Sequence, residues 1–185
     1  MKYLRITLVI LLLASITGCL THPESDTVQH SVRIAQPAGT VFMYVTNPGF
    51  WPAWHPSSVG VSAGADHSLD IGESVTEAFK VAGREGEVVW TVTEKVPDQK
   101  WAISGDIVDG NGTGGYITYE LREEGAETVF TRTFTYRILN FWHYLLNEIF
   151  VHKKIEQESQ AAVDALKAVL EEGKAPILEL GTNSD

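Results

Sequence analysis

Two charged side chains of this sequence, Glu77 and Arg132, are predicted to lie on strand faces that are otherwise apolar. Side chains two residues apart in a strand point to the same face of a sheet. The apolar residues that share this alternation are Val75, Phe79 and Val81 around the first, and Phe130, Phe134 and Tyr136 around the second. If these faces line a cavity, Arg132 can hold a ligand carboxylate through two hydrogen bonds. The alternative is a structural ion pair of Arg132 with Glu77, Glu120 or Glu148.

Three polar residues, Glu148, His152 and Ser159, interrupt the apolar stripe of a predicted C-terminal helix. Glu148 and His152 are one helical turn apart. Buried polar groups cost free energy unless they are paired or hydrated. We therefore expect the helix to cover a partly solvated cavity, in which Glu148 and His152 face Arg132 and Glu77. The alternative is that both helical residues reach solvent at the edge of the packed region.

The candidate ligand-binding residues are chosen because they share these inward faces. They are Glu77, Phe79, Arg132, Phe134, Tyr136, Glu148, His152 and Ile155. No catalytic residue is predicted. His55 would need an orienting carboxylate to act as a base, and the sequence indicates none, so packing or a surface position is expected. The histidines show no metal-ligand spacing, so we expect no metal and no other cofactor.

The helix that carries these polar residues is predicted to extend from Phe141 to Glu172, with a bend near residues 150–153. This segment contains neither Gly nor Pro and is rich in good helix formers. At 100° per residue, its apolar side chains downstream of the bend fall on one face. They are Val151, Ile155, Ala162, Val163, Leu166, Val169 and Leu170. Such a face needs an apolar partner surface of similar length.

Seven strands and two short helices are predicted upstream of this helix. The first strand spans Val28–Ile34, and one short helix begins at Pro37, with a second helical turn before a strand through Val59 and Val61. The remaining strands form a meander separated by Gly-rich and Pro-containing turns. They are predicted at Glu73–Ala82, Glu87–Lys95, Trp101–Ile107, Gly115–Arg122 and Glu127–Ile138.

The N-terminal segment is typical of an exported protein. A short basic region is followed by an apolar run that is too short to span a bilayer. The sequence from Ile16 to Cys19 then resembles the lipobox of bacterial lipoproteins. This resemblance implies cleavage before Cys19 and a diacylglycerol on its sulfur, which with further acyl chains gives stable membrane anchoring. Leu20, rather than Asp, resembles the signal for the outer membrane if the cell is Gram-negative.

Composition excludes several classes of partner. The chain has 185 residues and a formal charge of −10, which becomes −12 after removal of residues 1–18 with their two basic side chains. Such a charge argues against nucleic acid and against attraction to anionic lipid. One cysteine excludes an internal disulfide.

The order of the predicted elements, with several short motifs, resembles the START/polyketide-cyclase-like superfamily. These motifs are Val41-Phe42, Asn47-Pro48, Trp54-His55-Pro56, Thr91-Val92-Thr93-Glu94 and Leu166-Lys167. The resemblance implies an α+β helix-grip fold, in which an antiparallel sheet curves around the last helix and leaves a cavity between them. Known members include lipid carriers, aromatic cyclases and domains of unassigned activity, so the resemblance predicts fold better than function.

The sequence therefore predicts four segments. They are a signal peptide (1–18), a lipidated cysteine with a tether (19–27), the helix-grip domain (28–172) and a C-terminal tail (173–185). We expect a lipid-anchored, extracytoplasmic protein that binds a small or medium apolar ligand. One alternative is a cyclase- or hydrolase-like enzyme that uses the same cavity. The other is an interaction module whose aromatic rim binds a protein partner.

Overall fold

The computed structural model describes residues 25–64, 66–81, 84–108, 114–137 and 150–172. Their strands are β1 (Ser25–Ile34), β2 (Ser58–Val61), β3 (Ser74–Val81), β4 (Arg84–Val96), β5 (Lys100–Ile107), β6 (Gly115–Glu124) and β7 (Glu127–Arg137). Their helical elements are α2 (Ala38–Val45), the 3₁₀ turn η1 (Pro48–Phe50), α3 (Trp51–Trp54) and α5 (His152–Glu171). None of these helices is both long and apolar enough to cross a bilayer.

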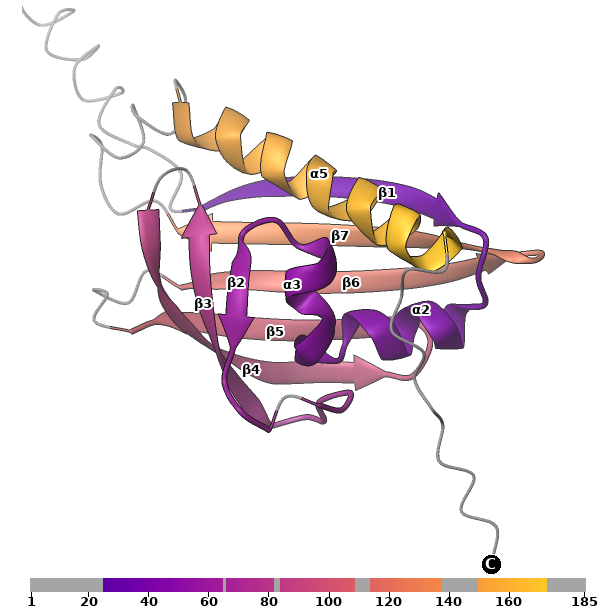
Figure 1. Cartoon of the computed structure of the whole chain (residues 1–185), viewed down its shortest axis with the longest axis horizontal. Helices are drawn as coiled ribbons and strands as arrows, with labels where there is room; N and C mark the ends of the chain where they lie inside the picture. Colours follow the sequence, from indigo (N-terminus) through magenta and orange to yellow (C-terminus); the bar gives the residue numbers. More distant parts are fainter. Residues whose placement is uncertain (1–24, 65, 82–83, 109–113, 138–149, 173–185) are drawn as a thin grey trace, which may run out of the picture.

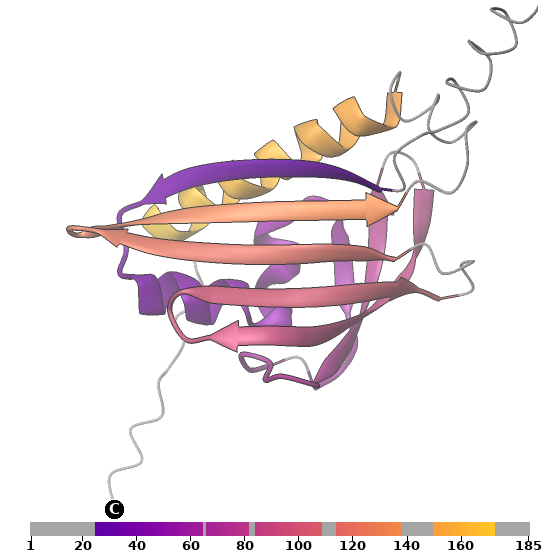
Figure 2. The ribbon, with the colours of Figure 1, turned by 180° about the vertical axis from the view of Figure 1, so that it is seen from behind.

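The strands form one antiparallel sheet in the order β1-β7-β6-β5-β4-β3-β2. The sheet is curved, and α5 lies across its concave side next to β1, while α2 and α3 cover the same side nearby (Figure 1). No described helix covers the back of the sheet (Figure 2). This architecture is the α+β helix-grip fold that the sequence predicts, with the helix on the side toward which the sheet curves.

The two ends of the sheet differ in which strands begin there. The register places Ser25 opposite Arg137, and Gly115 opposite Tyr136. Hence β1, β4 and β6 begin at one end of the sheet, where β3, β5 and β7 end. The helix α5 also begins there (Figure 1). We call this end the open end, because the interior is less covered there, and we call the opposite end the closed end.

The segment between β1 and β2 packs against the concave side through local signals. Pro37 precedes α2, where a fixed φ and the missing N–H suit a helix start. Asn47 caps η1, since its side-chain oxygen accepts a hydrogen bond from the backbone N–H of Gly49 at 3.0 Å. The indole Nε1 of Trp51 donates to the carbonyl oxygen of Val45 at 2.9 Å. These contacts turn the chain so that α3 faces α5.

The main core lies between the sheet, α2, α3 and one face of α5. The buried residues of α5 recur with helical spacing and are Ile155, Ser159, Ala162, Val163, Leu166 and Leu170. They pack with aromatic rings of the sheet and α3, including Trp54, Trp101, Tyr119 and Phe130. The predicted apolar face of the helix is therefore confirmed, apart from Val151 and Val169, which are half-buried.

At the closed end, α5 is fixed to the chain that follows β1. The side-chain amide nitrogen Nε2 of Gln36 donates to the backbone carbonyl of Leu170 at 3.0 Å. The backbone N–H of Ala35 donates to the Glu171 carboxylate at 2.7 Å. The first bond satisfies a carbonyl group that the helix terminus would otherwise leave without a partner. The C-terminal turn of α5 is thereby held against the end of β1.

Two predicted strand starts differ from the structure by three residues. Strand β1 begins at Ser25, three residues before the predicted start, because its pairing with β7 continues to Arg137. Strand β4 begins at Arg84, three residues before its predicted start at Glu87. Residues from Arg84 onward pair with β3, and Gly86 lies opposite Phe79. The part of the predicted C-terminal helix before Phe150 lies outside the described residues.

Candidate functional site

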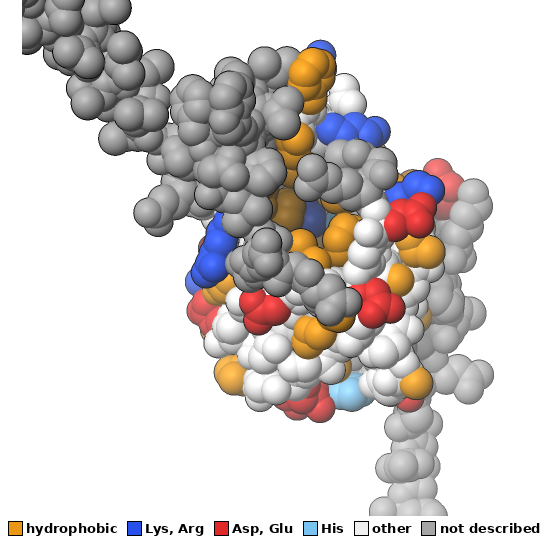
Figure 3. Space-filling view, turned by 90° about the vertical axis from the view of Figure 1, so that its left-hand side faces the viewer, with side chains coloured by type: hydrophobic (Ala, Val, Ile, Leu, Met, Phe, Trp, Pro, Cys, Tyr) orange, Lys and Arg blue, Asp and Glu red, His pale blue; other side chains and the backbone are white. Residues whose placement is uncertain are grey.

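Burial along the inward face of the strands decreases toward the open end. On β7, Phe130 is fully buried and Arg132 is 3% exposed, whereas Phe134 and Tyr136 are half-buried. On β3, Glu77 is buried and Phe79 is half-buried. Figure 3 views the molecule from the open end and shows a hollow, with hydrophobic and basic side chains at its floor. Among the described residues, the inward face of the sheet is thus least covered at this end.

Arg132 is the innermost charged group of this hollow interior. Its Nη1 donates to the Ser159 hydroxyl at 2.9 Å, and its Nη2 donates to Nε2 of His55 at 2.9 Å. Its carbon Cζ lies 5.5 Å from the centre of the Phe134 ring, within the range of a cation–π contact. The third donor position, Nε–H, is buried and has no hydrogen-bond acceptor among the described residues. One edge of the guanidinium is therefore available to a further acceptor.

The protonation of His55 follows from its contact with Arg132. Arginine can only donate, so Nε2 of His55 must accept and the proton must be on Nδ1. Nδ1 is buried, and no described residue accepts its hydrogen bond. Burial lowers the pKa of His55 well below its usual value, and the charge of Arg132 acts in the same direction. His55 is therefore neutral and presents a second buried donor beside Arg132.

Tyr119 and Glu77 complete the polar part of the interior. Burial raises the pKa of Tyr119 to about 12, although the neighbouring Arg132 acts in the opposite direction. The Glu77 carboxylate accepts a hydrogen bond from the indole Nε1 of Trp90 at 2.7 Å. Burial raises the pKa of Glu77, with Ser58, Trp90 and Arg132 opposing the shift. The interior thus has an acceptor at Glu77 and donors at Arg132 and His55.

The charges of Arg132 and Glu77 are not paired directly. Both side chains are buried, as their alternation predicts, but no ion pair within 4.0 Å joins them in the described part of the chain. Glu120, another predicted partner, is exposed on the other face of β6. Burial lowers the pKa of Arg132, while Tyr119 and Glu77 raise it. Ser159 and His55, the described residues that accept hydrogen bonds from the guanidinium, are neutral.

A second polar cluster lies at the open end, where α5 begins. Nδ1 of His152 lies 2.7 Å from a carboxylate oxygen of Asp26, and that oxygen also accepts from the Tyr136 hydroxyl at 2.9 Å. His152 was predicted to face Arg132 and Glu77 across the interior. It instead contacts β1 and β7 at the rim, because α5 begins there and β1 extends far enough to supply Asp26.

The other predicted site residues are distributed between the interior and the undescribed segments. Phe79, Phe134 and Ile155 lie on inward faces, as predicted. Glu148 and Cys19 lie outside the described residues. Ser159 does not pair with His152 but accepts from Arg132. The structure therefore brings Arg132, Ser159 and the unpredicted His55 together, and it separates them from the rim cluster of His152.

Glycines opposite aromatic residues provide a signal for the interior that pattern analysis did not use. Gly105 pairs with Trp90, and a Cβ at this glycine would lie 2.5 Å from the indole. A Cβ at Gly115 would lie 2.5 Å from the Phe134 ring. These rings can lie flat over the neighbouring strand only because the glycines have no side chain. A glycine facing an aromatic residue across a predicted sheet thus indicates a wall of the interior.

The curved sheet and its C-terminal helix define a helix-grip protein, and the family comparison agrees. Residues 25–171 match the family described as polyketide cyclase / dehydrase and lipid transport, and the chain belongs to this family. No curated protein matches the sequence.

Solved structures show the same fold at low identity. A START superfamily protein from Mycobacterium smegmatis has 15% identity and a TM-score of 0.61, covering 79% of this chain and 97% of its own. A protein from Chromobacterium violaceum has 14% identity and a TM-score of 0.60. The match covers 80% of this chain and 99% of that protein. DynU16, a putative protein in the dynemicin biosynthetic locus, has 18% identity and a TM-score of 0.58, covering 80% of this chain. The match spans only 48% of DynU16.

Proposed function

We propose that this protein binds an apolar ligand with an anionic group, and that the anionic group contacts Arg132. The observation that carries this proposal is a buried guanidinium whose hydrogen-bond partners, Ser159 and His55, are neutral. Burying an uncompensated charge costs several kcal/mol, which an anionic partner offsets. A carboxylate that accepts from Arg132 Nε–H and His55 Nδ1–H would satisfy both unpartnered donors.

The apolar part of the ligand would lie toward the open end. Phe79, Phe134 and Tyr136 are only half-buried there, and they form the aromatic wall that a ligand's apolar surface would cover. The family to which the chain belongs includes lipid transport in its description, which supports an apolar ligand. A small or medium carboxylic acid with an apolar body fits both parts of the interior.

The proposed location is outside the cytoplasm, on a membrane. It is supported by the lipobox-like residues that end at Cys19 and by the basic and apolar segment before them. Lipid on Cys19 would place the domain next to a bilayer, from which an apolar acid could be taken. Because Leu20 follows the cysteine, the proposed location in a Gram-negative cell is the outer membrane.

An equilibrium titration tests the ligand class. The full-length protein, held in amphipol, is titrated with 11-(dansylamino)undecanoic acid, whose fluorescence rises in apolar surroundings, and with the methyl ester of the same compound. We expect Arg132→Met to weaken binding of the acid about tenfold or more, because the substitution removes a buried charge partner. The ester, which has no charge, should bind both proteins alike. Equal binding of the acid to both proteins would contradict the proposal.

A second candidate function, acid–base catalysis, is favoured by the rim cluster. A carboxylate that holds one imidazole nitrogen orients the ring for proton transfer at the other nitrogen, and Asp26 and His152 have this geometry. The proton-transfer probe 5-nitrobenzisoxazole tests this function. Catalysis requires that His152→Gln and Asp26→Asn lower the rate of its ring opening, whereas equal rates in all three proteins would exclude this function for the cluster.

A further inference from the structure

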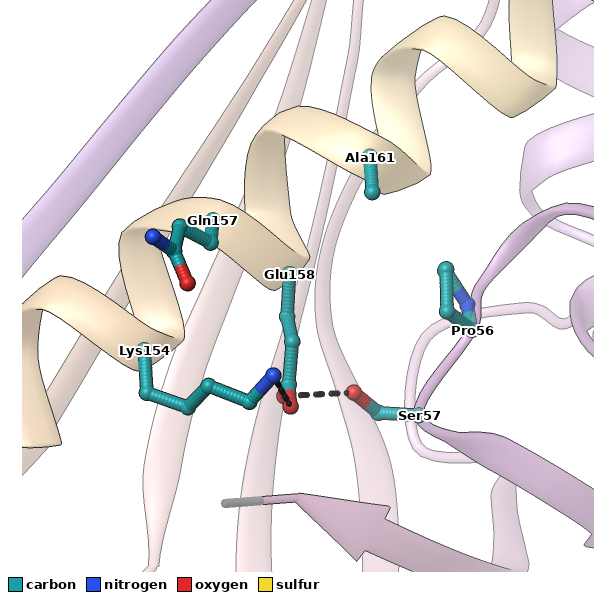
Figure 4. Close-up of a pocket in the computed structure, with 6 residues that line it drawn as sticks. All are labelled: Pro56, Ser57, Lys154, Gln157, Glu158 and Ala161. Atoms are coloured by element: carbon teal, nitrogen blue, oxygen red, sulfur yellow. Dashed lines mark hydrogen bonds and ion pairs between the residues drawn. The ribbon is translucent and has the colours of Figure 1, made fainter.

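A groove on the surface separates α5 from the loop that leads into β2 (Figure 4). Its volume is about 280 Å³. The residues that line it come from these two elements and are Pro56, Ser57, Lys154, Gln157, Glu158 and Ala161. Ala161 presents only a methyl group to the groove, so the space above it is not filled by its own side chain (Figure 4).

Two contacts of Glu158 close the bottom of this groove. The Ser57 hydroxyl donates to a Glu158 carboxylate oxygen at 2.9 Å, which joins the loop to α5. The other carboxylate oxygen lies 3.6 Å from Nζ of Lys154, one helical turn earlier. The side chain of Glu158 is only 17% exposed, so this contact lies below the surface. A hydrogen bond from a hydroxyl to a carboxylate contributes about 1.5–3 kcal/mol, so its opening is a local event that costs much less than unfolding.

Arg132 binds to the same two elements, at residues that neighbour this contact in sequence. His55, which accepts from Arg132, precedes Ser57 by two residues, and Ser159, which also accepts from Arg132, directly follows Glu158. The loop and α5 are therefore joined in two layers, by Ser57 and Glu158 on the outside and by Arg132 on the inside. The groove contact therefore lies next in sequence, on both elements, to the two groups that Arg132 binds.

We propose that this groove is a side entrance through which the anionic group of the ligand reaches Arg132, and that the Ser57–Glu158 hydrogen bond closes it. This inference rests on the proposed function and adds the route to it. The ligand class is the same, an apolar carboxylic acid. On entry, its carboxylate replaces the Glu158 carboxylate beside Lys154 and Ser57 and then passes to the guanidinium. The ammonium group of Lys154 attracts the incoming anion at the groove.

An entrance affects the rates of binding and release equally, because both directions use the same path. Ala161→Trp fills the groove from an exposed helical position, so it should slow association and dissociation of the dansyl acid about tenfold, with little change in affinity. Ser57→Ala removes the closing bond and should speed both rates. Gln160→Trp adds the same bulk one residue earlier, at an exposed position outside the groove lining, and is the matched control.

Stopped-flow fluorescence with 11-(dansylamino)undecanoic acid measures these rates in the full-length protein. Probe concentrations are kept well below the Kd of Arg132→Met, and the signal of that variant is subtracted as background. We expect opposite effects of Ala161→Trp and Ser57→Ala on both rates, and no effect of Gln160→Trp. Unchanged rates in both groove variants, with binding retained, would overturn the side entrance and assign entry to the open end. If no protein binds more probe than Arg132→Met does, the proposed function itself fails.

Discussion

The guanidinium of Arg132 carries a charge that water scarcely reaches, and its hydrogen bonds go to one hydroxyl and one imidazole. Neutral acceptors offset only part of the cost of removing that charge from water. A protein can retain such a residue when a ligand supplies the missing charge. Of the three carboxylates named for a structural ion pair, Glu77 forms none with Arg132, Glu120 is exposed on the other face of β6, and Glu148 lies outside the described residues. Ligand binding by Arg132 is therefore kept as the proposal.

Substitutions of Arg132 should separate its packing from its charge. Arg132→Ala should lower the free energy of unfolding by about 2–4 kcal/mol, because it leaves a cavity and removes the donors to His55 and Ser159. Arg132→Met should recover much of this loss, since a similar apolar volume replaces a buried charge. Urea denaturation followed by tryptophan fluorescence measures both. Changes within about 0.5 kcal/mol for both variants would mean that Arg132 behaves as a surface residue.

His55 should make the fold less stable in mild acid. Its folded-state pKa lies well below 6.5, because of burial and then Arg132, so below pH 6.5 the unfolded chain binds a proton that the folded protein does not. Stability therefore falls as the pH decreases from 6.5 toward the folded pKa, by at most about 1.4 kcal/mol per pH unit. Urea titrations at pH 7.5 and 5.5 measure this loss. His55→Gln should reduce the difference, and an identical difference in both proteins would contradict the assignment.

The N-terminus of helix α5 has no side-chain cap, since Val151 makes no such hydrogen bond, and the helix packs on the sheet through one apolar face. Leu166 is fully buried in the centre of that face. Leu166→Ala should cost about 2–5 kcal/mol in the free energy of unfolding, through lost burial and the cavity that remains. Lys153→Ala, at an exposed position of the same helix, should change stability by less than about 0.5 kcal/mol. Similar small losses from both substitutions would mean that α5 is not gripped by the sheet.

The sequence predicted which faces the elements bury but not which residues meet across the interior. Alternation placed Glu77 and Arg132 inward, and helical spacing placed Ser159 on the buried face. His55 could not be linked to Arg132 from its position, because 77 residues separate them and sheet curvature decides their contact. Asp26 was missed because it lies in the segment predicted to be a tether, 126 residues from His152.

At the scale of the whole molecule, the proposed anchor would place the interior near a bilayer, which is a source of apolar acids. Cys19 precedes the first residue of β1 by six positions, and six residues span at most about 20 Å. An anchor at Cys19 would therefore keep the open end, where β1 begins, close to the bilayer. The distance from the membrane to the site would then be short for a ligand that is poorly soluble in water.

Changing Cys19 tests the anchor. Cys19→Ser should leave an unprocessed precursor without lipid, because the sulfur that would carry the diacylglycerol is absent. Incorporation of radiolabelled palmitate, together with the electrophoretic mobility of the precursor and mature forms in the bacterial host, measures this outcome. A Cys19→Ser protein that still matures and remains in the membrane fraction would show that the lipoprotein assignment is wrong.

Native mass spectrometry of protein purified from its own membrane tests the central claim most directly, since it identifies what fills the interior. Wild-type protein and Arg132→Met are prepared in parallel, and the masses of bound molecules are compared. We expect an apolar carboxylic acid bound to the wild-type protein in a one-to-one ratio, and no such acid bound to Arg132→Met. A wild-type protein with no bound small molecule, or equal occupancy in both proteins, would contradict it.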